Sequence, residues 1–389
     1  MKFPKFSLSS ELNELERFES LDQKEKSIVF YSENENSRFI FKSLIDELIN
    51  IHNYNICYVT SSKDEQILNE SNKKIKTFCI GEGIARTKFF LNLKANMLIM
   101  TMPDLETFHI KRSKTYPVHY VYFFHAMVST HLVYRKNAFD HFDSIFCVGE
   151  YQIEEIRSTE KIYNLKPKNL VRCGYIHLDN LIKKNTIEYK SENNNDKQTQ
   201  ILLAPSWGKN GLFETNIEEI IDILLNSDYK VVLRSHPMSF KLSQKKIKSI
   251  EKKFLSNSNF KLEVNLSDFD SFLFSDIMIS DWSGVALEFA FAFEKPILYI
   301  DTPKKIHNPD FGKIPEIPIE ISIRDKIGKI ILPTEIKLIP NEIEKLKQEL
   351  PEIKKEIKNI RENKIFNVGS SKKIAAKQII KLLDELKNK

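Results

Sequence analysis

The sequence predicts an α/β protein made of two doubly wound halves, each a parallel sheet with helices on both faces. Short apolar runs alternate with amphipathic stretches along the chain, which is the pattern of βαβ units. A polar segment, residues 183–199, has almost no apolar content and divides this alternation into two series. Polar loops follow several of the apolar runs, and open α/β sheets bind ligands at that edge. These observations favour two domains that face each other across a ligand-binding cleft.

Length and composition are those of a globular protein. The chain has 389 residues, enough for two to three domains, with 41% hydrophobic and 29% charged residues. No eighteen apolar residues run together, so no membrane-spanning helix is expected. The first 27 residues lack the apolar region of a secretory signal. The four widely spaced cysteines are expected to be buried thiols of a reducing, cytoplasmic compartment, neither a metal site nor a disulfide framework.

The net charge of +6 is modest and is carried mainly by lysines, many of them in the C-terminal third. Such a surface is typical of an ordinary solvated protein in a lysine-rich organism. It also suits a cytoplasmic enzyme that touches the inner, anionic face of a membrane or a phosphorylated acceptor. No nucleic-acid partner is expected. The segment 1–26 is either a membrane-facing helix or a polar lead-in, and its weak apolar face favours the lead-in.

In the first half, strands and helices alternate from residue 27 to about residue 181. The expected strands are residues 27–31, 56–60, 75–80, 97–101, 119–124 and 144–148. Amphipathic spacing predicts helices over residues 37–51 and 151–157. We expect residues 1–182 to form an N-terminal, acceptor-binding domain, followed by a linker over residues 183–199.

The second half repeats the pattern and is expected to form a nucleotide-donor domain over residues 200–389. Its expected strands are residues 201–204, 230–234, 260–264, 277–279 and 296–300. Helices are expected over residues 217–225, 241–254 and 269–274, and two lysine-rich amphipathic helices over residues 341–359 and 370–387. The proline-containing segment 307–318 is expected to be an irregular loop.

The most informative motif is the segment 279–288, where an apolar strand breaks into a small polar turn and then an amphipathic stretch. A strand-to-helix junction of this kind offers free backbone N–H groups and a helix N-terminus to an anion. Ser283 supplies a hydroxyl, and Gly284 lets a phosphate approach the backbone. Glu288, in the second helical turn, is within reach of a ribose hydroxyl. An ordinary helix cap between buried strands is the alternative.

Two further loops carry histidines directly after strands. His125 ends the strand 119–124, where an imidazole could take a proton from an acceptor hydroxyl; the alternative is a histidine hydrogen-bonded within the sheet edge. His131 is expected to be a surface or packing residue. In the loop 234–237, Arg234 and His236 can both donate to phosphate oxygens, and Pro237 restricts the turn. A capped turn without a ligand is the alternative there.

The loop 204–209 follows the first strand of the second half. Ser206 and Gly208 suit a phosphate contact, and Trp207 could form a wall against a base or the acceptor, although a buried core tryptophan fits the sequence equally well. Gly174 lies where the chain leaves the first half. It is expected to matter for the backbone conformation there and not for the chemistry. These loops all follow predicted strands, and together they predict a nucleotide-using transferase with an interdomain site.

Two other patterns are weak. Residues 268–270, Asp-Phe-Asp, have the spacing of a metal-binding carboxylate pair but begin a helix, where Asp is a common cap, so no metal is expected. Residues 81–83, Gly-Glu-Gly, lack the third glycine of a dinucleotide fingerprint. No cofactor is predicted.

As an ordered set, His125, the loop 204–207, the loop 234–237 and the segment 280–284 resemble the CDP-glycerol glycerophosphotransferases of teichoic acid and capsule synthesis. The spacing to residues 295–297 and the exit 173–175 with Asp179 add to the resemblance, which covers roughly residues 95–300. It implies a GT-B fold and a peripheral membrane enzyme. It also implies transfer of a polyol phosphate from a CDP donor to a hydroxyl of a glycan or polymer, with release of CMP.

The same resemblance implies roles for individual residues. His125 corresponds to the catalytic base, and His236 to the histidine that contacts the donor phosphates. The loop that holds the CDP moiety matches Ser280, Asp281 and Ser283. One departure follows His125, where the family has Gly-Thr-Pro-Leu-Lys and this chain has Ala-Met-Val-Ser-Thr at 126–130. A GT-B glycosyltransferase that uses a CMP- or UDP-sugar therefore stays open, as does a non-catalytic nucleotide- or glycan-binding protein.

Overall fold

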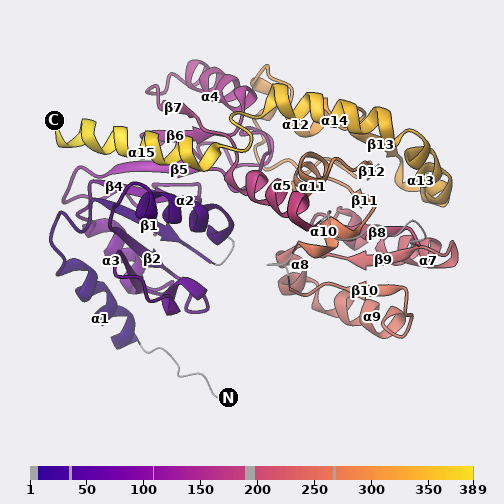
Figure 1. Cartoon of the computed structure of the whole chain (residues 1–389), viewed down its shortest axis with the longest axis horizontal. Coiled ribbons are helices and arrows are strands. Elements are labelled where there is room, and N and C mark those ends of the chain that lie inside the picture. The colour runs from indigo at the N-terminus through magenta and orange to yellow at the C-terminus, as the bar shows by residue number, and fades with distance from the viewer. Residues whose placement is uncertain (1–7, 35–36, 108, 189–197, 266–268, 389) are drawn as a thin grey trace.

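The computed structural model describes residues 8–34, 37–107, 109–188, 198–265 and 269–388. Two parallel sheets, each with its own flanking helices, form two domains that lie side by side (Figure 1). The first sheet has seven strands in the order β3-β2-β1-β4-β5-β6-β7, and the second has six in the order β10-β9-β8-β11-β12-β13. Each is doubly wound, because the strand order reverses direction at β1/β4 and at β8/β11.

The strands of the first domain are short and largely buried, as expected for a sheet covered on both faces. They are β1 Ile28–Ser32, β2 Ile56–Thr60, β3 Ile75–Cys79, β4 Met97–Met100, β5 His119–Phe123, β6 Ser144–Cys147 and β7 Asn169–Arg172. The helices between them are α1 Leu8–Glu19, α2 Arg38–Asn50, α3 Ile84–Asn92, α4 Glu150–Ile162 and α5 Ile176–Glu188, with a 3₁₀ turn η2 at Gln66–Asn69.

The second domain repeats this arrangement. Its strands are β8 Gln200–Leu203, β9 Lys230–Leu233, β10 Phe260–Leu262, β11 Ile277–Ser280, β12 Ile297–Ile300 and β13 Gly328–Ile331. Its helical elements are α6 Leu212–Thr215, α7 Ile217–Asn226, α8 Pro237–Leu242, α9 Gln244–Phe254, α10 Asp270–Phe274, α11 Val285–Phe293, η4 Phe311–Lys313, α12 Ile319–Ser322, η5 Pro333–Leu338, α13 Ile339–Gln348 and α14 Leu350–Lys364.

The predicted strands are confirmed to within a residue or two, but both sheets have an additional edge strand. Strand β7 was not expected because its sequence, Asn-Leu-Val-Arg, is half polar and mostly exposed, as an edge strand can be. Two predicted helices are each divided: residues 241–254 at Ser243, and residues 341–359 at Glu349. Pro351 explains the second break, since proline is tolerated in the first turn of a helix and not in its interior.

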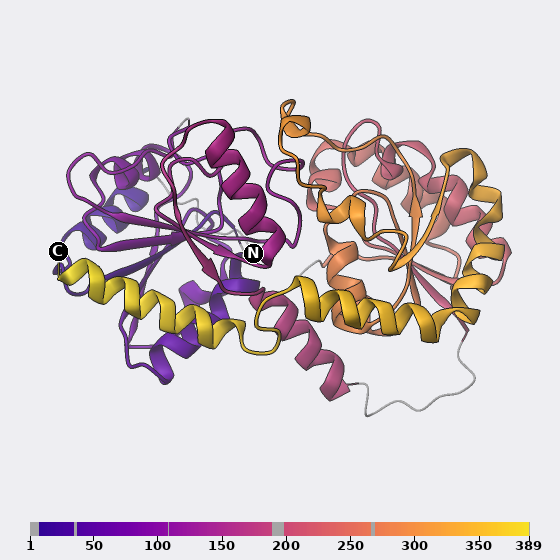
Figure 2. The same cartoon turned by 90° about the horizontal axis from the view of Figure 1, so that it is seen from above.

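The C-terminus crosses back to the first domain, in contrast to the expected division at residues 183–199. Helix α15, Ser371–Lys387, leaves α14 and packs against α2 and α5 (Figure 2). Apart from Ser371 in its first turn, its buried residues are apolar and lie at helical spacing, so this face needs a partner surface, which α2 and α5 supply. The expected linker also begins later, because α5 runs to Glu188 and packs against α11. Residues 189–197 of it lie outside the described residues.

The N-terminal helix α1 packs on the first domain through its apolar face. Phe18 contacts Phe78 and Phe89, with ring centroids 5.3 Å apart in both pairs. A helix held in this way covers β3 and α3. Residues 1–7 of the expected lead-in lie outside the described part of the chain. Among the residues described, no helix has the length and apolar content needed to cross a bilayer. The four cysteines are buried free thiols, as predicted.

Candidate active site

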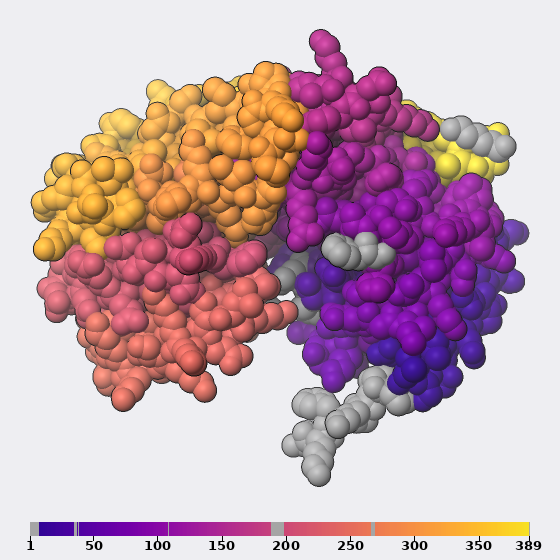
Figure 3. Space-filling model, turned by 180° about the vertical axis from the view of Figure 1, so that it is seen from behind, coloured from indigo at the N-terminus to yellow at the C-terminus, as the bar shows by residue number. Residues whose placement is uncertain are grey.

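A cavity of about 460 Å³ lies between the two domains, where the carboxyl ends of both sheets face each other. Seen from behind, the molecule is hollowed between the two halves (Figure 3). The residues that follow β1, β4 and β5 line one wall, and those that follow β8, β9 and β11 line the other. Both topological switch points therefore open into this cavity, which we call the cleft.

His125 lies directly after β5 and is exposed to the cleft. Its Nδ1 is 3.1 Å from the main-chain oxygen of Thr101 at the end of β4. A carbonyl can only accept, so Nδ1 carries the proton and Nε2 keeps a lone pair. Enclosure between the two domains lowers the pKa of the imidazole, and the Thr101 carbonyl partly opposes this effect. The ring is therefore neutral near pH 7, with a basic nitrogen available.

His236 has the opposite arrangement. It is the N-cap of α8, and its Nδ1 accepts the main-chain N–H of Met238 at 3.0 Å. The proton of the neutral ring therefore lies on Nε2, which can donate. Burial, together with the nearby charge of Lys305, lowers the pKa of His236 to about 4. One cleft histidine is thus set up to accept a proton, and the other to donate a hydrogen bond.

Trp207 is part of a cluster that includes two residues not singled out from the sequence, Lys305 and His307. The Nζ atom of Lys305 lies 3.9 Å from the centroid of the Trp207 ring, a cation–π contact. The Trp207 ring is 5.9 Å from that of His236 and 6.3 Å from that of His307. Burial lowers the pKa of Lys305 to about 8, against the attraction of Asp281. The ammonium is still mostly charged at neutral pH and lines the cleft.

Arg234 also lines the cleft, but its guanidinium is engaged within the second domain. It forms a buried ion pair with Glu263, with the nitrogen and oxygen 2.7 Å apart, and it lies 4.8 Å from the centroid of the Phe269 ring. Ser271 donates a second hydrogen bond to the same carboxylate. The charge of Arg234 is thus largely balanced by the protein, which favours an orienting role over a strong phosphate contact.

The expected turn at the start of α11 is present. Ser283 and Gly284 precede the helix and line the cleft, and a helix N-terminus at such a place can bind an anion through the backbone N–H groups of its first turn. Gly284 also has a packing role, since a Cβ atom there would lie 3.2 Å from a methyl carbon of Val128 and 3.6 Å from the Cβ of Ala126. The absence of a side chain lets the His125 loop approach the donor domain.

Ser280 and Asp281 are not among the residues that line the cleft, and their expected contact with the donor stays a prediction. Ser280 donates to the main-chain oxygen of Ala204 at 2.7 Å. Asp281 accepts from the N–H and the hydroxyl of Ser206, at 2.6 and 2.7 Å, and from the N–H of Leu212 at 2.9 Å. The Thr302 hydroxyl is a fourth, longer donor at 3.4 Å, and the carboxylate so occupied serves to shape the 205–212 loop. Ser206 lines the cleft, but its hydroxyl proton is directed to Asp281.

Glu288 reaches the floor of the cleft from the first turn of α11. Its Oε1 is 2.9 Å from the hydroxyl of Tyr175, and its Oε2 is 4.0 Å from Nε2 of His177. Burial raises the pKa of this carboxyl group to about 7, against the opposing effects of Tyr175 and Arg234. The ribose contact expected from the sequence stays a prediction.

The first-domain wall contains polar groups that the sequence analysis missed. Glu33, Asn34 and Ser37 follow β1, and Thr101 follows β4. The hydroxyls of Ser37 and Thr101 are 3.0 Å apart. The signal was available, because Glu33 and Asn34 follow a predicted strand and Thr101 ends one, at the same edge as His125. They extend the cleft on the side opposite the α11 turn.

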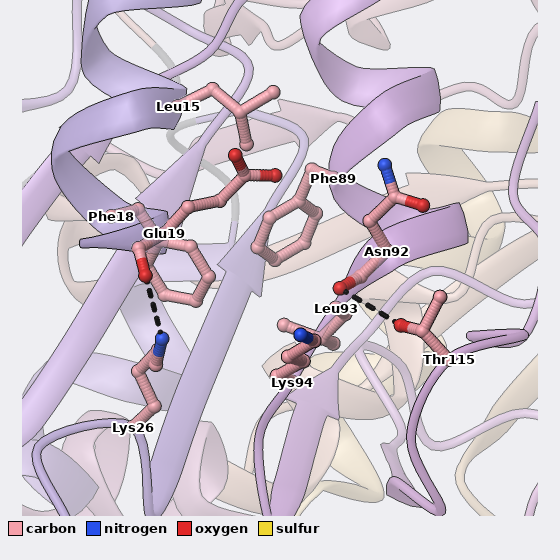
Figure 4. A pocket seen from close by; sticks show the side chains of 9 residues that line it. All are labelled: Leu15, Phe18, Glu19, Lys26, Phe89, Asn92, Leu93, Lys94 and Thr115. Carbon is pink, nitrogen blue, oxygen red and sulfur yellow. Dashed lines mark hydrogen bonds between the residues drawn. The ribbon is translucent and has the colours of Figure 1, made fainter. Parts of the chain in front are cut away.

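A second cavity, of about 280 Å³, lies between α1 and α3 (Figure 4). Two of its polar side chains are hydrogen-bonded to the main chain: Lys26 donates to the oxygen of Glu19 at 2.9 Å, and Thr115 to that of Asn92 at 3.3 Å. Its lining includes no predicted site residue. In the described part of the chain, no three His, Cys, Asp or Glu side chains are grouped to hold a metal ion. Asp270 begins α10 and pairs with Lys184 at 2.5 Å, and Asp268 lies outside the described residues.

Solved structures of similar fold include a polymerase, an epimerase and a glycosyltransferase. The wall teichoic acid polymerase TagF aligns over 97% of this chain and 94% of its own, at 14% identity and a TM-score of 0.56. UDP-GlcNAc 2-epimerase from Neisseria meningitidis aligns over 91% of this chain and 100% of its own, at 16% identity and a TM-score of 0.59. A glycosyltransferase from Rickettsia africae aligns over 92% and 98%, at 10% identity and 0.52. At such identities the likeness supports the fold, and the GT-B prediction is confirmed.

A sequence search of curated proteins found no match. The family model for CDP-Glycerol:Poly(glycerophosphate) glycerophosphotransferase, by contrast, matches residues 14–306, which include strands β1 to β12 and the loops that follow them. This range covers well over half of the chain and contains every predicted site residue. The chain therefore belongs to the CDP-glycerol:poly(glycerophosphate) glycerophosphotransferase family of enzymes.

Proposed function

We propose that this enzyme transfers glycerol phosphate, or a related polyol phosphate, from a CDP-linked donor to a hydroxyl of a surface glycan or a teichoic-acid-like polymer. The observation that carries the proposal is the pair of cleft histidines in opposite tautomers. A base with a lone pair on Nε2 suits the acceptor hydroxyl, and a neutral Nε2–H donor suits a phosphate oxygen. Family membership supports the CDP-linked donor.

The proposed reaction is a single displacement at the distal phosphorus of the donor. Nε2 of His125 takes the proton of the acceptor hydroxyl while its oxygen forms the new P–O bond. The bond between that phosphorus and the bridging oxygen breaks, and CMP leaves with the electron pair. Negative charge then grows on the CMP phosphate, where the Nε2–H of His236, the Lys305 ammonium and the N-terminus of α11 would stabilise it.

The first test is the substitution His125→Ala. We expect turnover to fall about 10²–10⁴-fold, the usual loss when a general base is removed, while the donor still binds. Release of CMP from CDP-glycerol in the presence of acceptor, followed by mass spectrometry, measures turnover. Thermal-shift titration with CDP-glycerol measures donor binding. His141→Ala is the matched control, because His141 is exposed and does not line the cleft.

Unchanged turnover in His125→Ala would remove His125 from the mechanism. The same assay with CDP-ribitol, CMP-sugars and UDP-sugars separates the alternatives. Breakdown of a sugar nucleotide alone would mean glycosyl transfer, in which the acceptor attacks an anomeric carbon. Binding of CMP or CDP without turnover of any donor would mean a non-catalytic nucleotide-binding protein.

We further propose that the enzyme acts from the cytoplasm as a peripheral protein of the membrane face. The positive net charge and the exposed lysines of α14 and α15 support this, since anionic lipids attract such surfaces. Co-sedimentation with vesicles that contain anionic lipid, compared with neutral vesicles, is the measurement. Equal binding to both kinds, or none to either, would contradict the proposal.

A further inference from the structure

Glu288 and Tyr175 connect the two domains beneath the proposed catalytic base. Glu288 belongs to α11 of the donor domain, and Tyr175 directly precedes α5 of the first domain. Both side chains are almost fully buried, with Tyr175 2% and Glu288 5% exposed as residues. The hydroxyl of Tyr175 is 2.8 Å from the main-chain oxygen of His125 and 2.9 Å from Oε1 of Glu288. This chain of contacts runs from the donor helix to the backbone of His125.

The Tyr175 hydroxyl has one proton and two oxygen neighbours. The main-chain oxygen of His125 has no proton, so it can only accept. An ionised Glu288 would also only accept, and the two oxygens would then compete for one proton. If the carboxyl group is protonated, both contacts become full hydrogen bonds: Glu288 donates to the Tyr175 oxygen, and Tyr175 donates to His125.

The surroundings of Glu288 favour the protonated form. Burial raises its pKa to about 7. His177, 4.0 Å away, supplies no positive charge, because burial lowers the pKa of that imidazole to about 3. Arg234 favours the ionised form, but its own ion pair with Glu263 balances much of that charge. The remaining neighbour, Tyr175, is a phenol whose pKa burial raises well above its ordinary range.

We propose that Glu288 is a positioning residue: as a neutral carboxylic acid it donates to Tyr175, and this hydrogen-bonded chain holds the His125 backbone at a fixed distance from the donor domain. The proposal rests on the proposed function, which makes His125 the base. It assigns Glu288 a different role from the ribose contact expected from its position in the sequence. A positioning role affects the chemical step, whereas a ribose ligand would affect donor binding.

The proposal predicts the outcome of three substitutions. Glu288→Ala and Tyr175→Phe remove a link and should lower kcat about 10- to 100-fold, with the KM for the donor unchanged, because a small misplacement of a catalytic group is costly. Glu288→Gln keeps a donor at the same place, so it should restore most of the kcat lost in Glu288→Ala. Tyr229→Phe is the matched control, since Tyr229 donates to Glu344 at 3.1 Å outside the cleft.

The dependence of kcat on pH distinguishes the proposed positioning role from a purely structural one. In the wild type, kcat should fall as pH rises through about 7, because ionised Glu288 competes with the His125 carbonyl for the Tyr175 proton. Glu288→Gln cannot ionise, so this limb should be absent. A donor KM more than tenfold higher in Glu288→Gln, with kcat and pH profile unchanged, would overturn the proposal in favour of a ribose ligand.

A spectroscopic measurement keeps this test separate from the identity of the base. Infrared difference spectra of the wild type, titrated from pH 5 to pH 9, should show a protonated carboxyl band that disappears through about pH 7 and that Glu288→Gln lacks. Absence of that band would overturn the proposal whether or not His125 is catalytic. If the band is present and His125→Ala keeps full turnover, the proposed function fails, and the positioning role fails with it because it has no base to hold.

Discussion

At the residue scale, the positive charge on the second-domain wall of the cleft depends strongly on Lys305. Arg234 is balanced by Glu263, and His236 stays neutral because burial and the charge of Lys305 lower its pKa to about 4. Lys305 is held over the face of Trp207, which keeps its charge at the cleft surface. A donor diphosphate carries at least two negative charges, so this ammonium should supply a large part of its binding.

We therefore expect Lys305→Met to raise the KM for the donor about 10- to 100-fold, the loss that accompanies removal of a hydrogen bond to a charged group. Burial has lowered the Lys305 pKa to about 8, so its charge is present below that pH and is lost as pH rises through it. Wild-type donor affinity should then weaken above about pH 8, and that of Lys305→Met should not.

Isothermal titration with CDP-glycerol from pH 6.5 to pH 9.5 makes both comparisons. Lys304→Met is the control, because Lys304 is the exposed neighbour and does not line the cleft. Similar donor affinity in Lys305→Met and Lys304→Met would exclude a phosphate contact by Lys305.

The sequence could predict a site residue only where its position after a strand is enough to bring it to the cleft. His125, His236 and Ser283 follow strands, and the parallel sheet brings such positions to one edge. The direction of each side chain is decided by neighbours far along the chain. Asp281 looked like a ligand, but it faces the 205–212 loop. Lys305 lies beyond β12 in a segment without a motif, and only the packing of Trp207 brings it to the cleft.

At the element scale, the segment 126–131 connects His125 to both domains. This is where the chain departs from the family pattern. Ser129 donates through its N–H and its hydroxyl to Glu320 of α12, at 3.0 and 2.7 Å. Thr130 does the same to Glu155 of α4, at 2.6 and 2.8 Å. His131, expected to be a surface or packing residue, is buried beside Glu155. Ser129 therefore supplies an interdomain tie to α12, and Thr130, where the family has a lysine, supplies a tie to α4 within the first domain.

These ties predict a pH-dependent stability. Burial raises the pKa of Glu320 to about 7 from an ordinary value of 4.5. A carboxyl group whose pKa is raised on folding stabilises the protein fully below its unfolded pKa, and this contribution is lost as pH rises through the folded pKa. A shift of this size corresponds to about 3 kcal/mol. The pKa of Glu288 is also raised to about 7, so this group likewise makes the protein less stable as pH rises.

We expect the melting temperature of the wild type to fall between pH 5 and pH 8, and that of Glu320→Gln to fall less. Differential scanning calorimetry across this range is the measurement. Glu349→Gln serves as control, since Glu349 is half-exposed and pairs with Lys329 at the surface. Parallel curves for the wild type and Glu320→Gln would mean that Glu320 is ionised throughout and only bridges the domains.

At the scale of the whole molecule, helix α15 makes the two domains one unit. The chain enters the second domain after α5 and returns to the first through α15, so two connections join the domains (Figure 2). Asp179 of α5 accepts the N–H groups of Gly369 and Ser371 at 2.6 and 2.8 Å and so caps the returning helix. The sequence predicted a helix there because its apolar spacing is local. It could not predict the crossing, because the partner surface on α2 is more than 300 residues away along the chain.

If α15 is part of the first domain, a cavity in its interface should destabilise that domain selectively. Leu383 is fully buried, and Leu383→Ala is expected to cost about 2–5 kcal/mol, the range for leucine truncation in a core. Hydrogen exchange should then show lost protection in α2, α5 and α15, with the β8–β11 region of the second sheet unchanged. Lys381→Ala, on the exposed face of the same helix, should leave both domains unaffected. Equal loss of protection in both sheets would instead mean that the domains unfold as a single cooperative unit, and that α15 stabilises the closed cleft as a whole.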